Sequence, residues 1–157
     1  MKTEDIDFYD HAILAALSVD GRISITALSQ KIGLSKTPCH ARIKRLEAAE
    51  FITGYRAIIN PIKLGLSHVA FVEVKLSDTR DKALAAFNKG VLAIREIEQC
   101  HMIAGSFDYL LKVRTQSIID YRQVMGEKIS TLPHVSMTAT FVAMEAIKEG
   151  HNMPSKG

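Results

Sequence analysis

Six basic residues gather in a stretch that contains no acid, and this stretch is the first feature of the chain that points to a chemistry. Residues 21–46 contain no Asp or Glu, and their bases are Arg22, Lys31, Lys36, Arg42, Lys44 and Arg45. The whole chain of 157 residues has a formal net charge of only +3. A local basic window is typical of a surface that faces nucleic-acid phosphates. A solvated basic face without a partner is the alternative, and charge alone does not decide.

The apolar spacing around this window predicts three short helices, at residues 7–17, 25–32 and about 36–49. The last two are joined by Ile32-Gly-Leu-Ser35, the short turn of a helix-turn-helix, whose second helix lies in the major groove of DNA. At 100° per residue, Cys39, Ile43 and Leu46 share one side of that helix, which should pack on the other two helices. A plain three-helix bundle with a basic surface is the weaker alternative.

The opposite side of the predicted third helix carries side chains that suit contact with DNA. Ala41 lets the helix approach the bases, and its methyl group can touch thymine. Lys44 and Arg45 can bind phosphate or guanine, and Thr37 and His40 can hydrogen-bond near the start of the helix. The residues expected to contact DNA are Ser35, Lys36, Thr37, His40, Ala41, Arg42, Lys44 and Arg45.

The second half of the chain predicts an α+β unit. Strands are expected at residues 68–76, 97–103, 109–114 and 135–144, and helices at 81–92 and 118–132. The order βαββαβ is that of a ferredoxin-like domain, in which both helices cover one face of a four-stranded sheet. The other face needs a cover, and a second copy of the chain would supply it.

A short turn between two predicted strands, Gly105-Ser-Phe-Asp-Tyr109, is the second candidate site. The carboxylate of Asp108 could accept a hydrogen bond from the α-ammonium of a free amino acid, and backbone N–H groups of the turn could receive its carboxylate. An Asx-type turn without a ligand is the alternative, and the turn residues alone favour it.

Several classes of function are not expected from these residues. Adjacent Cys100 and His101 on a strand would point to opposite faces, so they form no nucleophile–base pair. The histidines show no metal-ligand spacing, no glycine-rich phosphate loop exists, and no catalytic set is visible, so neither an enzyme nor a metal or prosthetic cofactor is predicted. The charged start, the two cysteines and the absence of an apolar run of about 18–20 residues predict a reduced, cytoplasmic protein without a secretory signal or membrane span.

Motifs in both halves resemble the Lrp/AsnC, or feast/famine, family of transcription regulators. In the first half the resemblance lies in DGRIS from Asp20, LSQKIGLS from Leu28, TPCHARIKRLE from Thr37 and FITGY from Phe51. In the second it lies in EQCHMIAGSFDYLLK from Glu98 and LPHV from Leu132. The similarity is greatest to the leucine-responsive branch and, within it, to regulators of proline catabolism.

The turn residues Asn60-Pro61 and Leu64-Gly65 predict a domain boundary near residues 60–66. With this boundary, the resemblance implies a winged helix-turn-helix DNA-binding domain at residues 1–60, a linker at 61–66 and a ferredoxin-like effector-binding and oligomerisation domain at 67–157. It also implies dimers on double-stranded DNA that assemble into octamers or other rings. One departure is that acids occupy residues 4–10, where the leucine branch often has a basic tail, which puts an extra N-terminal phosphate contact in doubt.

The resemblance further implies that a free amino acid, with leucine or proline as the first candidates, binds between the C-terminal domains. The matching positions are Met102, Gly105, Ser106, Phe107, Asp108, Tyr109, Ile118, Thr140, Phe141, Val142 and Ala143. An effector-independent architectural protein that bends DNA is the alternative within the class, and a small ferredoxin-like enzyme with a helical appendage is the alternative outside it. The effector, the operator and the sign of regulation do not follow from the sequence.

Overall fold

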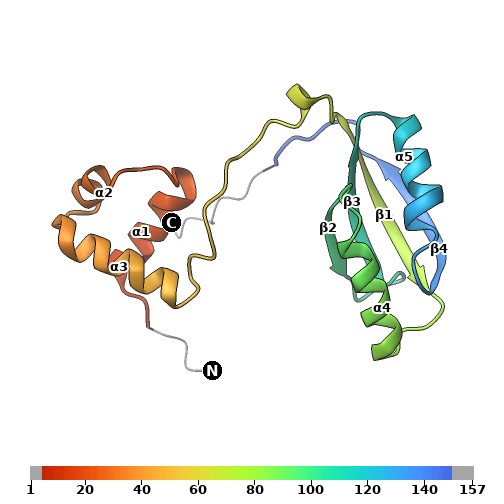
Figure 1. Cartoon of the computed structure of the whole chain (residues 1–157), viewed down its shortest axis with the longest axis horizontal. Helices are drawn as coiled ribbons and strands as arrows, with labels where there is room; N and C mark the ends of the chain where they lie inside the picture. Colours follow the sequence, from red (N-terminus) through yellow and green to blue (C-terminus); the bar gives the residue numbers. More distant parts are fainter. Residues whose placement is uncertain (1–4, 150–157) are drawn as a thin grey trace. The chain divides into compact units, whose positions relative to one another are not determined.

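The computed structural model describes residues 5–149, which form two compact units (Figure 1). The N-terminal unit contains the residues up to Ile58, with residues 148 and 149 also assigned to it, and the C-terminal unit is Ile59–Ile147. The predicted linker at 61–66 contains one short 3₁₀ turn, Ile62–Leu64, and is grouped with the C-terminal unit. In the described part of the chain, no helix is long and apolar enough to cross a membrane.

The N-terminal unit consists of helices α1 (Phe8–Val19), α2 (Ile25–Ile32) and α3 (Lys36–Ala48). Local chemistry sets their ends: the Ser24 hydroxyl accepts a hydrogen bond from the Ala27 amide, and Gly33 ends α2 in the left-handed conformation at φ 72°. Ser35 precedes α3 as predicted, but its side chain makes no capping hydrogen bond. The buried core of the three helices is Ile13, Leu14, Ala16, Leu28, Cys39, Ile43 and Leu46.

The chain after α3 differs from a simple hairpin wing. Residues 53–60 run without regular secondary structure and pair with no strand in the described part of the chain. Several of their apolar side chains are exposed, with Ile58 83% and Ile59 61% accessible. This segment is therefore unpaired chain and forms no sheet with the described residues.

The C-terminal unit contains the predicted β-α-β-β-α-β order. Its elements are β1 (His68–Leu76), α4 (Asp81–Leu92), β2 (Ile97–Met102), β3 (Tyr109–Thr115), α5 (Ile118–Val124) and β4 (Val135–Val142). The strands lie in the order β2-β3-β1-β4, every neighbouring pair is antiparallel, and α4 and α5 cover one face (Figure 1). This arrangement confirms the α+β class with a split βαβ domain.

One helix of the C-terminal unit differs from its predicted form. The sequence predicts a single helix over 118–132, whereas α5 passes into a π-helical turn at Met125–Ile129, closed by a 2.9 Å hydrogen bond from the Ser130 amide to the Met125 carbonyl. Gly126 lies in this turn, and glycine lowers the preference for regular α-helix. The apolar period alone does not reveal such a change of hydrogen-bond register.

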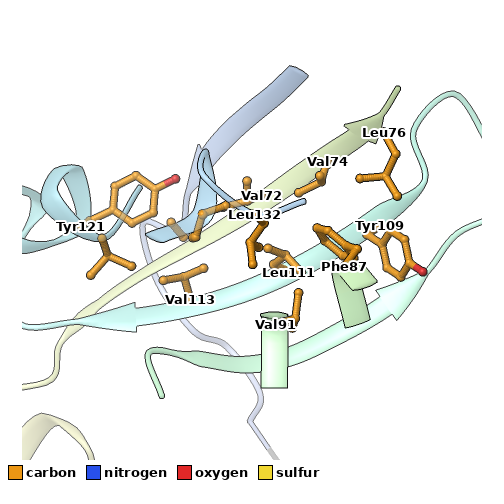
Figure 2. Close-up of a cluster of buried hydrophobic side chains, with 13 residues drawn as sticks. Val72, Val74, Leu76, Phe87, Val91, Tyr109, Leu111, Val113, Tyr121 and Leu132 are labelled. Carbon is orange, nitrogen blue, oxygen red and sulfur yellow. The ribbon is translucent and has the colours of Figure 1, made fainter. Parts of the chain in front are cut away.

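The core of the C-terminal unit lies between the sheet and the two helices (Figure 2). Alternate residues of β1, from Ala70 to Leu76, point into it, as strand geometry requires. The rings of Phe87 from α4 and Tyr109 from β3 pack with centroids 4.5 Å apart. This core holds the strand ends, and so the turn between β2 and β3, in fixed positions.

Candidate nucleic-acid interface and effector region

Helix α3 presents the exposed side that the helical spacing predicts. Cys39, Ile43 and Leu46 are buried against α1 and α2. The side chains of the opposite side that lie open to solvent are Lys36, Thr37, His40, Ala41, Lys44 and Arg45, while Arg42 is half-buried. The N-terminal unit therefore holds α3 by its apolar side and leaves the other available to a DNA groove.

Two of the predicted DNA contacts make ion pairs with α1. The Asp10 carboxylate is fully buried and accepts hydrogen bonds from Arg42 Nη1 at 2.9 Å and from Arg45 Nη2. Arg42 Nη1 also lies 2.7 Å from Asp7 Oδ2, and its guanidinium lies 5.4 Å from the centre of the Tyr9 ring. The basic window is thus partly neutralised by acids that precede it in the sequence.

The same two acids also cap α1. The Asp7 carboxylate accepts from the Asp10 amide and the Asp10 carboxylate accepts from the Asp7 amide, both at 3.0 Å, which forms a capping box. Burial acts to raise the pKa of Asp10, but the hydrogen bonds from Asp7, Arg42 and Arg45 outweigh it and lower this pKa to about 2. The carboxylate is therefore ionised at neutral pH.

The lysines of α3, Lys36 and Lys44, are more accessible to a DNA phosphate than Arg42 and Arg45 are. Lys44 Nζ lies 3.2 Å from Glu47 Oε2, and Glu47 Oε1 accepts from the Tyr55 hydroxyl at 3.0 Å. Hydrogen bonds from Lys44 and Tyr55 lower the pKa of Glu47, which stabilises its negative charge. Lys36, in the first turn of α3, forms no ion pair with the residues that the structure describes.

The Asp108 carboxylate lies at the predicted turn but is partly occupied by the protein itself. Its Oδ2 accepts from the Leu76 amide at 2.7 Å, while its Oδ1 lies 3.7 Å from Lys75 Nζ. The backbone of Asp108 also bonds to Val74 and Ile103, each at 2.9 Å. These contacts fix the turn and leave Oδ1 as the oxygen that a ligand could reach.

The rest of the turn is open on its backbone side. Within residues 5–149, the amides of Gly105 and Ser106 donate to no backbone or side-chain acceptor. Met102 is 62% exposed beside them, and Phe107 is half-buried. The Tyr109 side chain is buried, and its ring packs against Phe87 and supports the turn from the core.

Most of the remaining predicted effector residues lie toward the other end of the sheet. Tyr109 pairs with Val74 of β1, whereas Val142 pairs with Ala70, four residues away and thus about 13 Å along the strand. One chain therefore does not bring all the predicted effector residues into one pocket. Val142 and Ala143 lie nearest that end, Phe141 pairs with Phe71, and Thr140 pairs with Val72 in the middle of β1; Ile118 starts α5 after the last residue of β3.

Successive side chains of β4 lie on opposite faces of the sheet. The Thr140 hydroxyl is 2.6 Å from the Tyr121 hydroxyl on the helix side. Phe141 lies opposite Phe71 of β1 on the face that no helix of the described residues covers, and these residues are 54% and 37% exposed. Met137, on the same face, is 65% exposed. This uncovered face, together with the exposed Phe71, Met137 and Phe141, is called the open sheet face.

No cluster of His, Cys, Asp and Glu among residues 5–149 has the geometry to hold a metal ion. Cys39 is buried and Cys100 is half-buried, and burial raises the pKa of both thiols. Both cysteines therefore stay protonated at neutral pH, and neither is an activated nucleophile.

Comparison with known proteins finds two family matches along the chain. Residues 7–53 match a winged helix-turn-helix DNA-binding family, and residues 69–153 match the Lrp/AsnC ligand-binding domain. A proline dehydrogenase transcriptional activator from Rhizobium radiobacter is 62% identical over 94% of this chain and 95% of its own. A leucine-responsive regulatory protein from Escherichia coli (strain K12) is 42% identical over 98% of this chain and 93% of its own.

A solved structure is similar over nearly the full length. The transcriptional regulator from Neisseria meningitidis, determined as a complex with L-methionine, has a TM-score of 0.90 at 27% identity. The match covers 96% of this chain and 97% of that one. The predicted resemblance to a regulator family with a helix-turn-helix and a ligand-binding domain is thereby confirmed.

Proposed function

Because the chain belongs to the Lrp/AsnC family of transcriptional regulators, we propose that it activates transcription of a proline dehydrogenase gene in response to free proline. The observation that carries this proposal is the 62% identity, over 94% of the chain, to a proline dehydrogenase transcriptional activator. Leucine is the second candidate effector, since a leucine-responsive regulatory protein is 42% identical.

DNA binding is assigned to residues 1–60, with α3 as the helix that enters the major groove. Thr37, His40 and Ala41 line its exposed side and are small or polar enough to meet base edges. Lys36 and Lys44 supply the charge for phosphates, while Ser35 lies at the start of the helix. Ion pairs hold the guanidinium groups of Arg42 and Arg45 in place. This favours a role in orienting α3 on DNA over a role in general electrostatic attraction to phosphates.

Effector binding is assigned to the turn between β2 and β3. An amino acid that is buried must have both its ammonium and its carboxylate paired. Asp108 Oδ1 would accept from the ammonium, and the open amides of Gly105 and Ser106 would donate to the carboxylate. Met102 would then contact the apolar side chain of the ligand.

The second group of predicted effector residues needs another subunit to complete the same site. Ile118, Phe141, Val142 and Ala143 lie toward the other end of the sheet and Thr140 lies in its middle, on the strand across β1 from the turn, so we expect this group to reach the ligand from a neighbouring chain. The Lrp/AsnC regulators form oligomers, and we place this chain in dimers held by the open sheet face, with an octamer or another ring of dimers as the next level. The effector then lies where two dimers meet.

The test is transcription in vitro from a promoter region upstream of a proline dehydrogenase gene of the source genome. We expect the chain to protect a short segment of this region and to raise transcript levels when proline is added. Leucine, methionine and glycine serve as matched alternatives in separate reactions. Protection without any response to an amino acid would favour the effector-independent architectural protein, and absence of protection would refute the assignment of this target.

A further inference from the structure

The Asp10 carboxylate is a buried charge that links α1 to α3. It is fully buried in the N-terminal unit, and its two oxygens receive hydrogen bonds from Asp7, Arg42 and Arg45. Compared with apolar side chains of similar volume, buried ion pairs of this kind often give a core no extra stability, although removal of one partner is destabilising. What such a network does provide is a fixed geometry for the groups that it pairs.

Arg45 reaches from this buried carboxylate to the surface of α3. Its side chain is 52% exposed. Among the described residues, Arg45 donates a side-chain hydrogen bond only to Asp10, and only from Nη2. A guanidinium has five N–H donors in a rigid fork, so most of those on Arg45 remain for an outside acceptor.

Arg45 also stands between two surface hollows. One, of about 330 Å³, is lined by Asp7, Pro38, Ala41, Arg42 and Arg45. The other, of about 250 Å³, is lined by Asp5, Ile6, Arg45, Leu46, Ala49 and Phe51. An acceptor on DNA could therefore approach the fork of Arg45 beside the exposed side of α3, without displacing the buried carboxylate.

The network also removes net charge from this part of the surface. Two carboxylates, Asp7 and Asp10, offset two guanidinium groups, Arg42 and Arg45. Binding to DNA of any sequence grows with the number of phosphates that are neutralised, whereas discrimination between bases depends on how a guanidinium fork is oriented. A paired and oriented Arg45 therefore contributes more to discrimination than to general attraction.

We propose that Asp10 is a specificity-determining positioning residue for DNA binding: it orients the guanidinium of Arg45 and, with Asp7, cancels charge that would favour any DNA sequence. This inference rests on the proposed DNA-binding role of α3. It differs from a purely structural role in one measurable respect. Loss of the Asp10 charge raises affinity for random DNA while it lowers affinity for the selected sequence.

The experiment compares three full-length variants with the wild type. Asp10→Asn keeps the volume and removes the charge. Asp20→Asn removes the same charge from an exposed turn, where, among the described residues, the Asp20 side chain accepts only from the Arg22 amide, at 2.9 Å. Arg45→Lys keeps the positive charge and removes the fork, so it tests the proposal even if Asp10→Asn folds poorly. The probes are a duplex that the wild type enriches from a random pool, and mixed-sequence genomic DNA.

For Asp10→Asn we expect the ratio of the two affinities to fall about tenfold or more, equivalent to about 1.4 kcal/mol. Binding of mixed DNA should become more dependent on salt. The slope of log affinity against log salt concentration should rise in magnitude by about 0.9 for each guanidinium that newly contacts a phosphate. Asp20→Asn should keep the wild-type ratio. Arg45→Lys should lose more affinity for the selected duplex than for mixed DNA.

Two results would overturn the inference. The first is an Asp10→Asn variant that binds both probes more weakly in the same proportion, because a purely structural role would lower both affinities alike. The second is an Arg45→Lys variant that keeps the wild-type ratio. If the wild type itself enriches no duplex, the proposed DNA-binding function fails, and this inference fails with it.

Discussion

Replacement of Asp108 should separate ligand binding from the stability of the turn, because its two carboxylate oxygens have different partners. Oδ2 accepts from the Leu76 amide at 2.7 Å, whereas Oδ1 has only Lys75 Nζ at 3.7 Å among the described residues. Asp108→Asn can keep an oxygen for the Leu76 amide and replaces the other by an NH₂ group, which repels an ammonium. Asp108→Ala removes both acceptors.

The expected magnitudes follow from these interactions. A hydrogen bond between a carboxylate and an ammonium contributes about 1.5–3 kcal/mol, so Asp108→Asn should weaken proline binding about ten- to a hundredfold. Its unfolding free energy should change by less than about 1 kcal/mol, because the bond to the buried Leu76 amide survives. In Asp108→Ala that amide loses its acceptor, which costs about 1–3 kcal/mol.

Isothermal titration calorimetry with proline and thermal denaturation measure the two effects on the same samples. A loss of about 1 kcal/mol lowers the melting temperature of a domain of 60–100 residues by about 4–8 °C, which is readily resolved. Asp81→Asn is the matched control, since it removes one exposed charge from the first turn of α4. If Asp108→Asn binds proline as tightly as the wild type does, the ammonium is not at Asp108, and an Asp108→Ala variant of wild-type stability would refute the role of the Leu76 bond.

Three further predictions concern the network, the DNA surface and the open sheet face. The pKa of Asp10 falls from 3.8 to about 2 on folding, so its ionised carboxylate contributes about 2 kcal/mol of stability above pH 4, and this contribution is lost as the pH falls through about 2. In acid denaturation, the difference in unfolding free energy between the wild type and Asp10→Asn should therefore narrow between about pH 4 and pH 2. A difference that stays constant would contradict this prediction. Replacement of Lys36 and Lys44 by alanine should make DNA binding less dependent on salt. The slope of log affinity against log salt concentration should fall in magnitude by about 0.9 for each phosphate that the variant no longer neutralises. An unchanged slope in an anisotropy titration would show that these side chains lie outside the interface. Phe71 and Phe141 pair with each other across β1 and β4. The double substitution Phe71→Lys and Phe141→Lys should therefore shift dimers to monomers in sedimentation velocity. Dimers that remain intact would place the interface elsewhere.

Much of the fold could be predicted because its causes are local. The alternation of apolar residues gives the bounds of β1, 68–76, and the helical spacing gives the bounds of α4, 81–92. Gly33 ends α2 in the left-handed conformation that glycine favours. The buried and exposed sides of α3 also follow from the spacing, since a helix held by one side must turn its apolar residues inward.

The details of the sites depend on contacts between residues far apart in the sequence, and these could not be predicted. Arg42 and Arg45 fall in a window without acids, yet their partner Asp10 lies 32 and 35 positions earlier, on another helix. The sequence offers one signal: two acids spaced by three residues, Asp7 and Asp10, precede two arginines with the same spacing, Arg42 and Arg45. The spacing alone does not show that the acids and the arginines are in contact. The bond from Leu76 to Asp108 likewise spans 32 positions and arises from the pairing of β1 with β3.

Control of transcription by free proline requires that binding of this amino acid changes how tightly the chain binds DNA. It is tested most directly by measuring the affinity for the selected duplex with and without saturating proline, and the affinity for proline with and without that duplex. Coupling between two binding sites is reciprocal, so both affinities must change by the same factor, which is typically about 5–150-fold. Equal factors above about fivefold are the expected result. A DNA affinity that none of the twenty amino acids changes would contradict control of this chain by an amino acid.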